Sequence, residues 1–158
     1  MNQSVQPSTR GTGQRIAIIS SMWHAELVSR AREAFIDDLT GHGWPPDKLQ
    51  THEVPGAFEI PLLAQTLARR GEVAAIVACA LIVDGGIYRH DFVAHAVLHG
   101  LMRVQLDTGI PVLSVVLTPQ AFHEHADHQQ FFGEHLLKKG QEAARACRHV
   151  LMQQQAAA

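Results

Sequence analysis

The sequence predicts an α/β fold in which a four-stranded parallel sheet lies between two layers of helices. Short apolar, β-branched segments alternate along the chain with segments of helical periodicity, in the order βαβαβαβα. The apolar run at 73–83 is continuous, as is typical of a parallel strand covered on both faces. Because crossovers between parallel strands are right-handed, these units favour a three-layer α/β/α sandwich of flavodoxin-like type.

The individual elements follow one another with short connections. Apolar, β-branched runs predict the strands, and apolar residues from Leu27 to Leu39 recur at the spacing of a helix with one buried face. Glycine and proline mark the turns between strands and helices, as at 84–86. In chain order we expect strands and helices at about 15–20, 27–39, 49–54, 58–68, 73–83, 90–106, 111–117 and 132–152.

Length and composition fit one folded domain at 15–153, preceded by a flexible tail at 1–14, in a chain of 158 residues. Apolar residues make up 46% and charged residues 18%, and the net charge of -2 argues against a nucleic-acid partner. No apolar run approaches the ~18 residues of a membrane span, and the polar start predicts no secretory signal. We therefore expect a cytoplasmic protein without a membrane partner.

The candidate site lies in the connections after the four strands, because such sheets bind ligands beyond the carboxyl ends of their strands. After the first strand, Trp23 offers an indole for stacking on a flat heteroaromatic ring, and packing under a loop is an equal alternative. After the second strand, Gly56 permits close backbone approach to a ligand. Glu59 either stabilises the helix start or accepts hydrogen bonds from ligand hydroxyls, and its spacing alone favours the first.

The connection after the third strand carries the clearest chemical signal. Gly85 and Gly86, placed before a helix start, form a nest for an anion. Arg89 adds a guanidinium suited to phosphate, and His90 exchanges protons near neutral pH. The alternative is a plain strand-to-helix turn with Arg and His on its surface.

The sequence gives less support to a metal site or to a nucleophilic cysteine. The histidines at 123–128 have no thiol partner, and we expect no metal site, although a metal-dependent hydrolase stays open as an alternative. Cys79 lies in a buried strand and is expected to be a small core residue. One polar stripe of the third helix, in which an arginine opposes cation binding, comprises Asp91, His95, His99 and Arg103.

These connections together resemble the lumazine synthase family, over the chain from Arg15 to about Val150. The segment VPGAFEIP at 54–61 matches the second-loop motif of that family, and Trp23 and Lys139-Gly140 fit its pattern. The segments DGGIYRHDF at 84–92 and LTP-x-x-FHE resemble the divergent type II branch, which assembles as decamers of two pentamers.

The resemblance implies condensation of 5-amino-6-(D-ribitylamino)uracil with 3,4-dihydroxy-2-butanone 4-phosphate, giving 6,7-dimethyl-8-ribityllumazine, phosphate and water. It implies an imine (Schiff base) intermediate, no cofactor and no metal, and active sites at the interfaces of a homo-oligomer. Trp23 would stack on the pyrimidine, Glu59 would hold the ribityl chain, and Ser114 would close the pocket of a neighbouring subunit. The residues that it implies for binding the ribitylaminouracil are Trp23, Ala57, Phe58, Glu59, Leu81, Ile82, Val83 and Ser114.

The sequence departs from the family pattern where the usual turn has two threonines and a catalytic histidine. Ile87, Tyr88 and Arg89 stand at those positions, and the histidine follows at His90. Since an arginine stays protonated near pH 7, we expect Arg89 to stabilise the leaving phosphate and His90 to transfer protons. The usual phosphate-binding arginine before the last helix is also missing. The residues expected to bind phosphate are Gly86, Ile87, His128 and Lys139.

A second class of function stays open at this point. Because the usual threonines and catalytic histidine are replaced, the chain also fits a flavodoxin-like protein that binds a lumazine or a flavin and catalyses the reaction only weakly. A structural assembly without a ligand is a more distant alternative.

Overall fold

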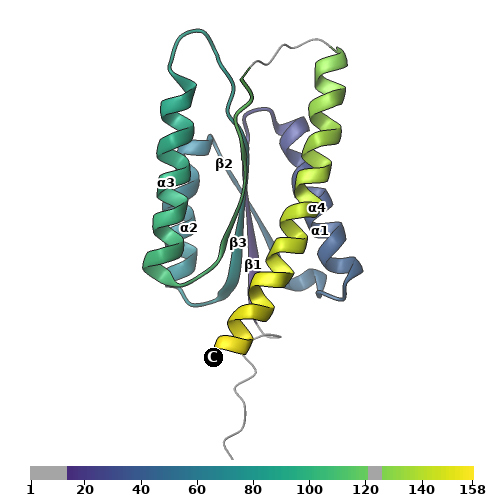
Figure 1. Cartoon of the computed structure of the whole chain (residues 1–158), viewed down its shortest axis with the longest axis vertical. Coiled ribbons are helices and arrows are strands. Elements are labelled where there is room, and N and C mark those ends of the chain that lie inside the picture. Colours follow the sequence, from purple (N-terminus) through teal and green to yellow (C-terminus); the bar gives the residue numbers. More distant parts are fainter. Residues whose placement is uncertain (1–13, 121–125) are drawn as a thin grey trace, which may run out of the picture.

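The computed structural model of the protein describes residues 14–120 and 126–158 and has the expected three layers (Figure 1). Four parallel strands form one sheet in the order β2-β1-β3-β4, which confirms the flavodoxin-like arrangement. The expected tail at 1–14 lies outside the described residues except for Gln14. The strands are β1 (Arg15–Ser21), β2 (Leu49–Val54), β3 (Val73–Leu81) and β4 (Val112–Leu117).

Helices α1 and α4 cover one face of the sheet, and α2 and α3 cover the other (Figure 1). Two short 3-10 turns, η1 and η2, precede β2 and α2. None of the helices in the described residues combines the length and the apolar character that a membrane crossing requires. The helical bounds are α1 (Ala25–Gly41), η1 (Pro46–Lys48), η2 (Ala57–Glu59), α2 (Ile60–Arg69), α3 (His90–Thr108) and α4 (Ala126–Ala157).

Strand alternation divides the core into two apolar clusters, one on each face of the sheet. Ile16 and Ile18 of β1 face α1 and α4, while Ala17 and Ile19 face α2 and α3. All nine residues of β3 are buried, as expected of a parallel strand covered on both faces. Cys79 is one of them, and burial raises the pKa of its thiol to about 12, so it is a core residue as predicted.

Several expected boundaries differ from the structure. The strand expected to end at residue 83 ends at Leu81, although the Ile82 N–H still donates to the Leu117 carbonyl across 2.8 Å. The second helix starts as the 3-10 turn η2, and the α-helix proper begins at Ile60 with a proline in its first turn. The last helix, expected at 132–152, runs from Ala126 to Ala157, and its Gln- and Ala-rich C-terminal end favours the extension there.

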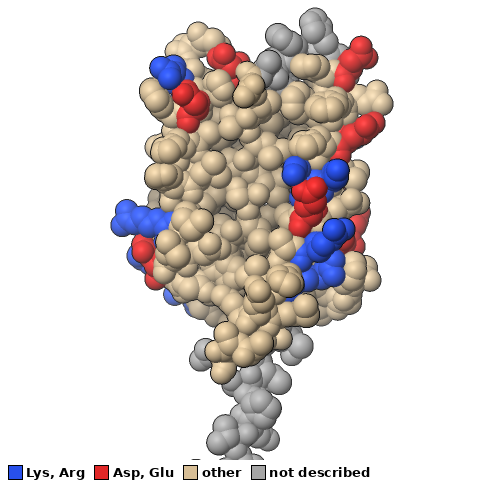
Figure 2. Space-filling model, in the orientation of Figure 1, with Lys and Arg blue, Asp and Glu red and all other residues tan. Residues whose placement is uncertain are grey.

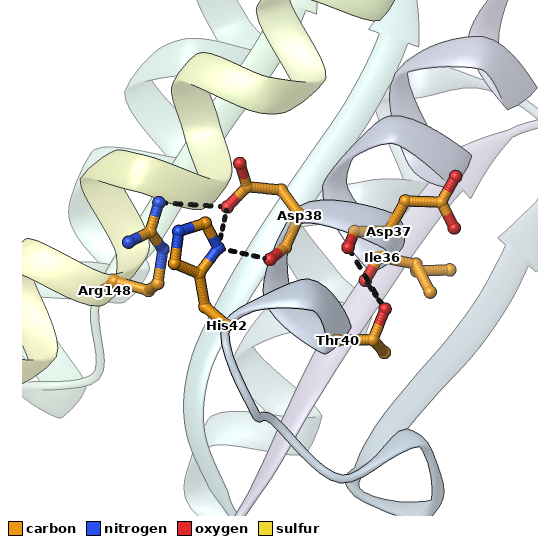
Figure 3. A network of polar contacts seen from close by, with 6 residues as sticks. All are labelled: Ile36, Asp37, Asp38, Thr40, His42 and Arg148. Carbon is orange, nitrogen blue, oxygen red and sulfur yellow. Dashed lines mark hydrogen bonds and ion pairs between the residues drawn. The ribbon is translucent and has the colours of Figure 1, made fainter.

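Helices α1 and α4 pack closely and are joined by an ion pair near the end of α1 (Figure 3). Arg148 Nη2 donates to Asp38 Oδ1 across 3.0 Å, and His42 Nδ1 lies 2.7 Å from the Asp38 carbonyl oxygen. Further along the contact, Gly140 lies directly against the backbone of Ala31, where a Cβ atom has no room. The glycine of the Lys139-Gly140 pair therefore sets how closely the two helices approach.

Replacing Gly140 by alanine is expected to lower the free energy of unfolding by about 1–3 kcal/mol, because the new Cβ would overlap the Ala31 backbone and push the helices apart. Urea unfolding measures the change. Gly41→Ala at the end of α1 is the matched control, since a Cβ there meets nothing within 4 Å. Equal stability of the Gly140→Ala variant and the wild type would contradict the close contact.

Candidate active site

The carboxyl ends of the four strands lie at one end of the sheet, at the top of the view in Figure 1. The register pairs Ser21 of β1 with Val54 of β2, and the Met22 N–H donates to the Val54 carbonyl across 2.9 Å. On the other side of β1, Ser20 pairs with Cys79 of β3. The connections after these three strands therefore begin at nearly the same level and next to one another.

The side chain of Trp23 is exposed at this end of the sheet. Its exposed fraction is 59%, so the alternative that it packs under a loop of its own chain is wrong for the described residues. The following residue, His24, has φ 53° and ψ 42° and caps α1. It is the only non-glycine residue with positive φ in the described part of the chain, and this left-handed conformation turns the chain directly after the indole.

The segment after β2 is fixed by a local hydrogen bond between Gly56 and Glu59. The Gly56 N–H donates to Glu59 Oε2 across 2.9 Å, at the start of η2. Glu59 thus stabilises the helix start, as its spacing favoured, with one of its two carboxylate oxygens. Both Glu59 and Phe58 are exposed, while Ala57 is half-buried, so this turn presents its side chains outward at the same edge as Trp23.

Tyr88, which the sequence analysis gave no role, organises the turn after β3. Its hydroxyl donates to the Val83 carbonyl across 3.1 Å. Its ring lies against Gly85, where a Cβ atom would come within 3.1 Å of a ring carbon. Gly86 has φ +73°, a conformation that favours glycine. The turn therefore favours glycine at position 86 and leaves little room for a side chain at position 85, and Ile87 at its tip is 95% exposed.

Carboxylates of the same turn already engage the groups expected to bind phosphate. The Gly86 N–H donates to Asp84 Oδ1 across 2.8 Å, and His90 Nδ1 lies 4.0 Å from the same oxygen. Arg89 donates through Nε and Nη2 to the two oxygens of Asp91, at 3.3 and 3.1 Å. The hydrogen bonds from Arg89 lower the pKa of Asp91, and Asp91 raises the pKa of Arg89.

The side chains of Leu81 and Ile82 are buried, so only their backbone can face a ligand, and the Ile82 N–H is already donated to Leu117. Val83 likewise has its carbonyl engaged by the Tyr88 hydroxyl. Ser114 is exposed on β4, two strands away from β1, and does not join Trp23 within one chain.

The two residues expected to replace the missing phosphate-binding arginine lie on α4. The His128 ring contacts the edge of Phe132, with the ring centroids 5.6 Å apart. Lys139 Nζ contacts Glu142 Oε2 at 2.7 Å, beside the Gly140 contact with α1 rather than at the turn after β3. Within one chain the structure does not bring Lys139 to that turn.

Other candidate ligands of a metal do not converge in the described residues. His95 and His99 of α3 are exposed, with ring centroids 4.1 Å apart, as their spacing predicts. Among residues 14–120 and 126–158 no group of three His, Cys, Asp or Glu is placed to hold a metal ion. The histidines at 123 and 125 lie outside the described residues. The metal-dependent hydrolase alternative thus finds no support in the part of the chain described.

The parallel sheet and the exposed turns at the carboxyl ends of its strands define an α/β protein of the kind that binds a small ligand at that end of the sheet. A family model for 6,7-dimethyl-8-ribityllumazine synthase matches residues 13–155, so the chain belongs to that family. Its curated relatives agree. The protein named 6,7-dimethyl-8-ribityllumazine synthase from Rhodococcus erythropolis is 62% identical over 134 residues, covering 85% of this chain and 86% of the relative.

Two further relatives carry the name 6,7-dimethyl-8-ribityllumazine synthase 2. The one from Pseudomonas syringae pv. tomato is 49% identical over 138 residues, covering 87% of this chain and 81% of the relative. The one from Bradyrhizobium diazoefficiens is 49% identical over 139 residues, covering 88% of this chain and 83% of the relative.

Replacing Glu59 by alanine is expected to lower the free energy of unfolding by about 0.5–2 kcal/mol, because the Gly56 N–H then loses its acceptor. Glu59→Gln keeps an amide oxygen as acceptor and is expected to lose less. Thermal unfolding of the two variants measures the difference. Equal losses, or none, would show that the hydrogen bond does not stabilise the start of α2.

Proposed function

We propose that this chain is a transferase of riboflavin biosynthesis that makes 6,7-dimethyl-8-ribityllumazine. The 5-amino group of 5-amino-6-(D-ribitylamino)uracil attacks the ketone of 3,4-dihydroxy-2-butanone 4-phosphate, and an imine forms with loss of water. The C–O bond to phosphate then breaks and its electron pair leaves with inorganic phosphate. The ribitylamino nitrogen finally closes the ring with loss of a second water.

The observation that carries the proposal is the exposed indole of Trp23, at the end of the sheet where the 54–59 segment and the 84–91 turn also begin, in a chain of this family. Trp23 stacks on the pyrimidine, whose edge faces the backbone at 81–83. The exposed turn Ala57–Glu59 holds the ribityl chain, and Glu59 accepts hydroxyl hydrogen bonds with the oxygen that Gly56 does not use. Holding two substrates in register supplies much of the acceleration for such a condensation.

The 84–91 turn takes the phosphate end of the second substrate. Arg89 supplies a permanent positive charge that stabilises the leaving phosphate, together with the backbone at Gly86 and Ile87. A phosphate that uses the Gly86 N–H must displace the Asp84 carboxylate from it. His90, the less exposed neighbour of Arg89, transfers protons, and His128 contributes to the phosphate environment from the first turn of α4. Lys139, which pairs with Glu142 away from this turn, takes no part within one chain.

The proposed active site is completed by a neighbouring copy of the chain in a decamer of two pentamers. Ser114 lies exposed on β4, an edge strand, where it serves a neighbour's pocket rather than its own. Figure 2 shows few charged side chains over the β4 edge between α3 and α4. The large apolar side chains of α3 that are exposed in one chain also favour this assembly; they are Phe92, Leu98, Met102 and Leu106.

A sedimentation coefficient of a single chain, measured under assay conditions, would contradict the assembly.

One observation favours the second candidate, a protein that binds a lumazine or a flavin and turns over weakly. The Gly86 N–H is already engaged by the Asp84 carboxylate of its own turn, so it is not available to a phosphate in this conformation. Yellow protein after purification, together with no product from the two substrates, would support this alternative over the synthase.

The purified protein, mixed with both substrates, is expected to form fluorescent lumazine and one phosphate per lumazine. Arg89→Lys and His90→Ala are each expected to slow the reaction by about tenfold or more, because lysine lacks the planar donor fork of the guanidinium and alanine cannot carry a proton. Arg103→Lys and His149→Ala, at exposed positions of α3 and α4, are the matched controls. Full rate in both site variants would reject these two roles.

A further inference from the structure

We propose that Asp91 is a positioning residue, whose carboxylate holds the Arg89 guanidinium so that its outer edge faces the phosphate of the substrate. This inference rests on the proposed function and deepens it. Asp91 itself does not touch the substrate, and it acts through Arg89.

The hydrogen bonds of Arg89 show which of its donors stay available. A guanidinium has five N–H groups, and the pairing with Asp91 takes Nε–H and one hydrogen of Nη2. One hydrogen of Nη1 and the second hydrogen of Nη2 form the end edge of the group, while the other Nη1 hydrogen points back toward Cδ. This end edge can bind two phosphate oxygens side by side. Asp91 thus occupies the side edge of the guanidinium and leaves the end edge, which is the outer edge, for the phosphate.

The ring of Phe92 fixes a second direction of the same guanidinium. Arg89 Cζ lies over the ring, 4.4 Å from its centre, so the ring limits where the guanidinium can move. Arg89 is the N-cap of α3, and Asp91 and Phe92 lie in its first turn, where the Phe92 N–H donates to the Arg89 carbonyl across 3.0 Å. A rigid element therefore supplies both contacts, and the long arginine side chain loses less freedom when phosphate binds.

The ion pair between Arg89 and Asp91 is too exposed to stabilise the fold strongly. The Arg89 and Asp91 side chains are 69% and 53% exposed, and pairs this exposed add little to stability. The pair Arg103–Asp107 on the same helix gives a natural comparison. Its Nε–Oδ2 distance is 3.3 Å and it lies away from the candidate site, at the other end of α3.

The test is a double-mutant cycle that measures binding of inorganic phosphate. Asp91→Asn is made in the wild type and in the Arg89→Met background, and Asp107→Asn is the matched control. In the wild type, Asp91→Asn is expected to weaken phosphate binding by about fivefold or more, and in the Arg89→Met background by less than about twofold. The KM for the butanone phosphate should rise in parallel, while the KM for the ribitylaminouracil stays constant.

Equal losses in both backgrounds would show that Asp91 acts on the fold, and tighter phosphate binding would show that it only repels the anion. Either result, or no phosphate binding by the wild type, overturns the inference. Asp91→Glu, which keeps the carboxylate, should recover part of the affinity. Wild-type protein that binds phosphate but forms no lumazine would refute the proposed function alone, because the binding cycle still decides the role of Asp91.

Discussion

Pairing of β1 with both β2 and β3 is the constraint on which the candidate site depends. Its register sets Ser21 beside Val54 and Ser20 beside Cys79, so the three strands end at one level. A slip of one residue would send every side chain of a strand to the other face and expose the apolar core. The two buried clusters hold the register in place, and the register brings the connections after the three strands together.

Short-range polar contacts then shape these connections. Glu59 satisfies an N–H at the start of η2, Tyr88 spans the turn after β3, and Asp84 and Asp91 each engage a donor on that turn. The charge of Arg89 is thus paired within the turn before any ligand arrives. This pairing is compatible with an arginine where the family pattern has a histidine, since the guanidinium is held by Asp91 rather than left unpaired at the surface.

Periodicity predicted the fold well because burial on two faces leaves a pattern that every strand and helix repeats. The order of elements and the bounds of β2 follow from it, as does the core position of Cys79. The contact between Asp91 and Arg89 leaves no such pattern, because an exposed pair two residues apart depends on how one turn is bent. The expected role of Ser114 in the pocket of a neighbouring copy came only from the family resemblance. Lys139 was likewise expected to bind phosphate, but within one chain it lies away from the turn after β3.

The measurement that bears most directly on this account is a structure of the assembled protein with a lumazine analogue and phosphate. The account places the heterocycle on the indole of Trp23, its ribityl chain along 57–59, and the phosphate on the outer edge of Arg89. A heterocycle bound elsewhere, with that edge of the sheet left empty, would contradict the central claim that the carboxyl ends of β1, β2 and β3 form the active site.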